Sequence, residues 1–258
     1  MRYEVRDNMK NTQATKPLYF LLNLLIVWIA FDSAILIHEW THGFVAWLNG
    51  AKSNPFNIYY GDWTLLNVDE AVDYPSLLKA SRHWTVACIA ISPIVVNLLL
   101  TLYPLSLMRK KHIQQKTWLY TFLFWFSAFN LAEFFAYIPI RTFTSHADIF
   151  NFNHALNISP WIIGLIGGFC SVFLISYFFS KILPMTYRVL HIHKLWAQLI
   201  YLLAMLFTFF IIGGYRGAEH YGPISAWMGT ISLTMIPIVF ILCFPTLKWV
   251  QSAASKSA

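Results

Sequence analysis

The sequence has 258 residues, of which 58% are hydrophobic, 18% aromatic and only 11% charged. A soluble domain usually has about 25% charged residues, so this composition excludes an ordinary soluble domain and indicates a polytopic protein of the lipid bilayer. The formal net charge is +7, but the basic residues lie in loops between apolar runs, which argues for membrane orientation and against a nucleic-acid partner.

Residues 1–17 are polar and are predicted to form a cytoplasmic N-terminal segment. Six apolar runs follow, and each is long enough for a helix to cross a bilayer, which takes about 20 residues, while the first run is longer than a bilayer needs. These runs cover residues 18–48, 83–108, 117–140, 161–184, 195–213 and 226–247. We therefore predict an all-α polytopic membrane protein with about six transmembrane helices.

The first connection, residues 49–82, is polar and carries strand-type residues on both sides of Gly61-Asp62. This pattern predicts a small loop or β-hairpin segment after the first span. A strand edge beside a catalytic site could bind an extended substrate by strand addition, and the alternative is a surface loop without a role.

The distribution of basic residues predicts how the chain is oriented. Thirteen of the 18 Lys and Arg residues fall on the side that holds both termini, and five fall on the other side. Cytoplasmic loops carry the excess of Lys and Arg. Both termini of this multi-pass protein are therefore predicted to be cytoplasmic, and the loop at 141–160 is predicted to lie on the opposite side.

The first span contains the segment His38-Glu39-Trp40-Thr41-His42. On a helix the two histidines, four residues apart, lie on one face, so both imidazoles can reach one metal ion. Glu39 lies beside that face and can act as general base on a water molecule, a pattern typical of zinc hydrolases. Ionisable residues are costly inside a membrane, which favours a functional interpretation over a polar seam between helices.

A catalytic zinc ion usually has three protein ligands and one open position. The candidates for the third ligand are Asp148, Glu133, His146, and Glu219 with His220. Asp148 lies in the loop that is predicted to share a side with the two histidines. This agreement favours Asp148, with Glu133 and His146 as its rivals.

Three stretches of the sequence resemble the site-2 protease family of intramembrane zinc metalloproteases. The stretches are His38-Glu39-Trp40-Thr41-His42-Gly43, then Ser92-Pro93-Ile94-Val95-Val96-Asn97, and finally Asn130 followed by Ile138-Pro139-Ile140 and Asp148. The resemblance covers residues 18–153 and implies a metalloprotease core of three spans there. Residues 154–258 then add three further spans and a C-terminal tail.

The resemblance also implies roles for single residues. His38, His42 and Asp148 would bind Zn²⁺, and Glu39 would be the catalytic base. Asn97 and Asn130 would bind the backbone of the substrate or shape the site. The implied activity is hydrolysis of a peptide bond in or near a transmembrane segment of a membrane protein or peptide substrate.

A second function stays open at this point. The chain could be a non-catalytic, metal-binding membrane protein that binds other membrane proteins, although the intact Glu39 favours a hydrolase. A di-iron lipid oxidase is disfavoured because such enzymes need several histidine clusters. The remaining histidines form no second cluster of suitable spacing.

Overall fold

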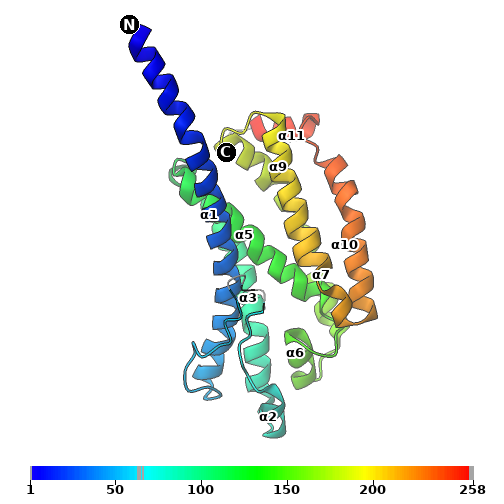
Figure 1. Cartoon of the computed structure of the whole chain (residues 1–258). Coiled ribbons are helices and arrows are strands. Elements are labelled where there is room, and N and C mark those ends of the chain that lie inside the picture. The colour runs from blue at the N-terminus through cyan, green and yellow to red at the C-terminus, as the bar shows by residue number, and fades with distance from the viewer. Residues whose placement is uncertain (1, 63–64, 66, 256–258) are drawn as a thin grey trace.

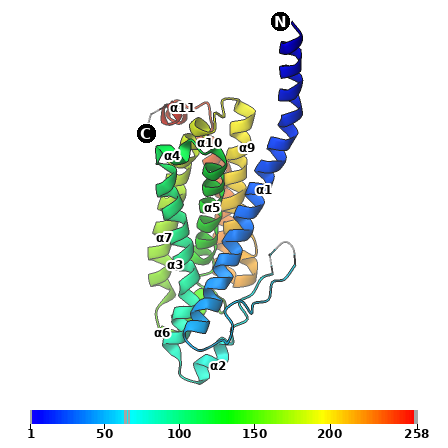
Figure 2. The same ribbon diagram turned by 90° about the vertical axis from the view of Figure 1, so that its left-hand side faces the viewer.

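The computed structural model describes residues 2–62, 65 and 67–255, and its ribbon is a bundle of helices (Figures 1 and 2). Six helical segments in this part of the chain are long and apolar enough to cross a membrane, which confirms the predicted all-α polytopic fold. The long segments are α1 (Arg2–Leu48), α3 (His83–Met108), α5 with η1 (Thr117–Phe135, Ala136–Ile140), α7 with η2 and α8 (Pro160–Tyr177, Phe178–Ile182, Leu183–Val189), α9 with η3 and η4 (Leu195–Leu206, Phe207–Tyr215, Ala218–Tyr221), and α10 (Pro223–Leu242). The shorter helices are α2 (Tyr74–Lys79), α4 (Lys111–Gln114), α6 (Asp148–Leu156) and α11 (Lys248–Ser255).

The predicted spans are correct in number and order, and they differ from the structure mainly at their ends. The last helix begins at Pro223 and ends at Leu242, whereas residues 226–247 were expected. Proline is favoured in the first turn of a helix, because backbone N–H groups there have no partner within the helix and proline loses no hydrogen bond by lacking one. The residue before Pro245 is driven out of the helical conformation, which explains the early end.

Helix α5 occupies the centre of the bundle, between α1, α3 and α9 (Figure 2). Most of its side chains are buried. The outward faces of the other helices expose large apolar side chains, such as Trp28 on α1 and Phe169 and Phe173 on α7. Exposed apolar surface of this extent suits contact with lipid. The start of α1 and helix α11 lie at the same end of the bundle, as an even number of spans requires (Figure 1).

The connection between α1 and α3 is a loop closed by one pair of residues. Tyr59 and Asp69 form an isolated antiparallel bridge with two backbone hydrogen bonds of 2.9 Å. No strand occurs among the residues of this loop that the structure describes, and substrate binding by strand addition stays a prediction. The loop packs directly on α1, where a methyl group at Gly43 would overlap the carbonyl of Pro55.

Helix α6 lies within a segment that the sequence predicted to be a loop. It packs against α3, near the end of the bundle at which α2 lies (Figure 1). Asp148 is its first residue and is buried. A helix N-terminus favours a carboxylate, because the peptide dipoles place partial positive charge there. The short helix thus brings Asp148 against the first span.

Candidate metal centre

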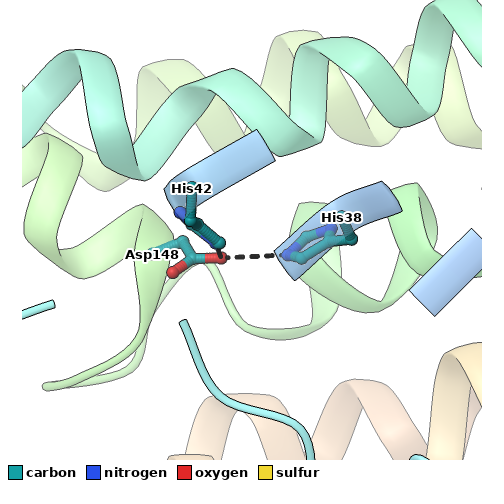
Figure 3. Close-up of side chains that lie close together, drawn as sticks. All are labelled: His38, His42 and Asp148. Atoms are coloured by element: carbon teal, nitrogen blue, oxygen red, sulfur yellow. Dashed lines mark hydrogen bonds and ion pairs between the residues drawn. The ribbon is translucent and has the colours of Figure 1, made fainter. Parts of the chain in front are cut away.

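Three buried side chains from two distant parts of the chain converge on one point (Figure 3). His38 and His42 come from α1, and the centroids of their rings are 5.1 Å apart, as the spacing of one helical turn predicts. The Nε2 atoms of His38 and His42 lie 3.4 and 3.1 Å from Oδ2 of Asp148. All three residues are less than 9% exposed.

The spacing of these three atoms suits a zinc ion. Tetrahedral zinc has Zn–N and Zn–O bonds of about 2.0–2.1 Å, which sets neighbouring ligand atoms about 3.3 Å apart. The distances of 3.4 and 3.1 Å match this separation. His38 Nε2 is also buried and has no hydrogen-bond partner. A bound cation would satisfy this atom, so the donor set fits a metal ion.

Asp148 is available in its charged form. Burial alone would raise the pKa of its carboxyl group. When the His42 imidazole is protonated, its positive charge and its hydrogen bond, together with His38 at 3.4 Å, outweigh burial and hold the pKa of Asp148 below its usual range. A carboxylate that is ionised and buried beside two imidazoles is a suitable third ligand for a divalent metal.

The outer nitrogen of each imidazole is held by a neighbouring element. His42 Nδ1 lies 2.9 Å from the carbonyl oxygen of Ile89 and 3.3 Å from the hydroxyl of Tyr74. Donation of the Nδ1–H to Ile89 leaves Nε2 as a lone-pair donor to a metal. Such contacts fix the tautomer and the ring direction of a metal-binding histidine.

His38 is oriented by Asn97 of α3. The side-chain Nδ2 of Asn97 lies 2.9 Å from His38 Nδ1, while Asn97 Oδ1 is buried without a partner. Turning the amide by 180° exchanges these two atoms, so that Oδ1 accepts the Nδ1–H of His38. His38 Nε2 then presents its lone pair to the metal. Asn97 was expected to bind substrate or to shape the site, and its contact in the structure is with a proposed ligand.

Replacing Asn97 by leucine is expected to weaken zinc binding by about 10- to 100-fold, the usual effect of losing a group that orients a ligand. Asn97→Asp keeps an oxygen acceptor for His38 and should retain more of the affinity. Competition with a chromogenic chelator measures both values. Unchanged zinc affinity in Asn97→Leu, together with a higher KM for substrate, would instead favour the predicted role in substrate binding.

Two carboxylates lie beside the three proposed ligands. Glu39 is 9% exposed, and its Oε2 is buried without a hydrogen-bond partner. Glu70, from the loop before α2, offers a carboxylate oxygen that lies within 4.8 Å of ligand atoms of Glu39 and His42. A carboxylate oxygen of Glu39 therefore lies within 4.8 Å of a ring nitrogen of His42, one of the proposed ligands. Glu70 was not among the predicted site residues, because nothing in its local sequence indicates that the loop returns to α1.

These groups open onto a chamber of about 790 Å³. Its walls come from α1, the loop before α2, the end of α5 with η1, the segment around α6, and the connection between η3 and η4. Polar side chains dominate these walls. The chamber therefore provides a place for water and for a polar peptide backbone beside the first span. It also extends beyond the predicted core of residues 18–153, because residues 212–221 complete one wall.

The other predicted residues are not among the three proposed ligands. Glu133 and His146 line the chamber, but neither belongs to a group of three possible metal ligands among the described residues. Asn130 is fully buried, and its amide donates to the carbonyl of Phe126 on the same helix. It does not line the chamber, and its contact with substrate stays a prediction. Glu219 is exposed and pairs with His220 at 3.9 Å.

Comparisons of the chain with protein-family models, with curated proteins and with solved structures found no match. The resemblance to the site-2 protease family therefore depends on the motif residues themselves. Their arrangement in space is the independent observation on which a function can be proposed.

Proposed function

We propose that the chain is an intramembrane zinc metalloprotease that resembles the site-2 protease family. The observation that carries the proposal is the convergence of His38, His42 and Asp148 at distances that suit zinc, next to the buried carboxylate of Glu39. The two histidines and Glu39 occupy α1, a helix that is long and apolar enough to span a membrane, and Asp148 begins the short helix α6 beside it. The expected substrate is therefore a peptide segment in or near the bilayer.

When bound, zinc would lower the pKa of a water molecule to about 7 and polarise a carbonyl group. Glu39 accepts the proton of the attacking water, whose oxygen bonds to the scissile carbonyl carbon. The C–N bond then breaks, and Glu39 delivers the proton to the leaving amine. Asn97 and the carbonyl of Ile89 hold the two imidazoles in place throughout. The substrate must be locally unwound, because a helix shields its own peptide bonds.

Metal removal tests this function. Purified protein in liposomes would be incubated with synthetic transmembrane peptides that contain helix-weakening residues, and products would be identified by mass spectrometry. We expect cleavage that 1,10-phenanthroline abolishes and that added zinc restores. If zinc binds and no peptide in the set is cleaved, the non-catalytic metal-binding function becomes the better explanation.

A further inference from the structure

A second feature of the chamber is a stack of planar side chains that begins at the metal centre. The ring of Tyr137 lies parallel to that of His38, with centroids 4.8 Å apart and an angle of 18°. Arg141 Cζ lies 4.8 Å from the centroid of Tyr137 and 4.5 Å from that of Tyr221. Tyr221 in turn stacks on His146 at 5.0 Å. The guanidinium of Arg141 is thus held between two tyrosine rings.

The stack leaves the hydrogen-bonding edge of Arg141 without a partner. In the part of the chain that the structure describes, every ion pair joins a histidine to Asp148 or Glu219. No side-chain hydrogen bond of Arg141 occurs there either, and its contacts are the two rings. A guanidinium is always charged and carries five N–H donors. A partly buried cation of this kind, in the wall of a chamber, is suited to bind an anion.

The geometry of Arg141 suits an anion with paired oxygens. A guanidinium fork matches two oxygens of a carboxylate or a phosphate, and the rings of Tyr137 and Tyr221 stack on both sides of it. Of these two anions, a peptide substrate supplies the carboxylate. The two contacts of 4.8 Å that join Arg141 to His38 through Tyr137 place the guanidinium no further from His38 than about three extended residues. A peptide that reaches the metal could therefore reach Arg141 as well.

We propose that Arg141 binds a carboxylate of the peptide substrate, so that cleavage falls within a few residues of an acidic side chain or of a free C-terminus. The proposal rests on the proposed protease function. The proposal also gives the last two spans a role in substrate binding. Tyr221, in the connection between them, completes the stack that holds Arg141.

The test uses synthetic transmembrane peptides that are identical except for Glu or Gln near the expected cleavage site, each with a free or an amidated C-terminus. Binding is measured to the Glu39→Gln protein, which keeps its metal, and cleavage is measured with active protein. We expect the carboxylate-containing peptides to bind about 10- to 100-fold more tightly than their neutral partners, the range of a charged hydrogen bond. Arg141→Gln should remove this difference, and Arg141→Lys should retain part of it.

Arg109→Gln is the matched control, because Arg109 also lies over a tyrosine ring, that of Tyr177, but does not line the chamber. Zinc content checks that each variant is folded. A preference for Glu peptides alone identifies an acidic side chain as the ligand, and a preference for free ends identifies the C-terminus. Equal binding of charged and neutral peptides to protein with Arg141 would overturn the proposal. Arg141-dependent binding without any cleavage would retain this site and reject the protease function.

Discussion

Glu39→Gln is expected to abolish peptide cleavage while the protein keeps its metal. Glutamine has the same shape as glutamate but cannot accept a proton, and general-base catalysis contributes about 10²- to 10⁴-fold to a rate. The group formed by His38, His42 and Asp148 does not include Glu39. The loss should therefore appear in kcat, with the zinc content unchanged.

The surroundings of Glu39 explain why so large an effect is expected. Its side chain is buried at the wall of the chamber. No hydrogen-bond partner occupies Oε2, so this oxygen is free to accept a proton. Glu219→Gln is the matched control, since Glu219 is exposed and lies outside the chamber wall. Activity of Glu39→Gln within a few-fold of the wild type would reject Glu39 as the base. Glu70, which lies close to His42, would then be the next residue to test.

Local spacing was sufficient to predict the histidine pair and the neighbouring Glu39. The positions i and i+4 of a helix share a face whatever the helix packs against, and the length of an apolar run alone predicts a span. These features depend on residues that are close together in the sequence. For the same reason, the order of the six spans was predicted correctly and their ends were less accurate: proline residues shift the ends of the last helix, and additional helical turns lengthen the fourth and fifth spans.

The partners of the histidines could be predicted only in part. The predicted side of the membrane favoured Asp148, but nothing local indicated that it would begin a helix rather than lie in a loop. The contacts of Ile89, Tyr74 and Glu70 depend on how the loop after α1 folds back onto the site. The stack at Arg141 joins residues from two distant connections, so only tertiary packing brings it about.

Loss of a ligand is the second large effect. Asp148 is buried against both imidazoles, so Asp148→Ala leaves two neutral nitrogens and no anionic donor. Groups that only orient a ligand contribute 10- to 100-fold to metal affinity, so removing a ligand itself should weaken binding by more than about 100-fold. His38→Ala should have an effect of the same size. Both variants should therefore lose their zinc during purification.

The most direct measurement is the zinc content of the detergent-purified protein, taken alongside His38→Ala, Asp148→Ala, Glu133→Ala and His146→Ala. Gel filtration would show that each variant is folded. We expect about one zinc per chain in the wild type, in Glu133→Ala and in His146→Ala, and almost none in His38→Ala and Asp148→Ala. Zinc retained in Asp148→Ala would move the third ligand elsewhere. A wild-type protein that binds no zinc, even after reconstitution with the metal, would contradict the proposed metal centre and the protease function together.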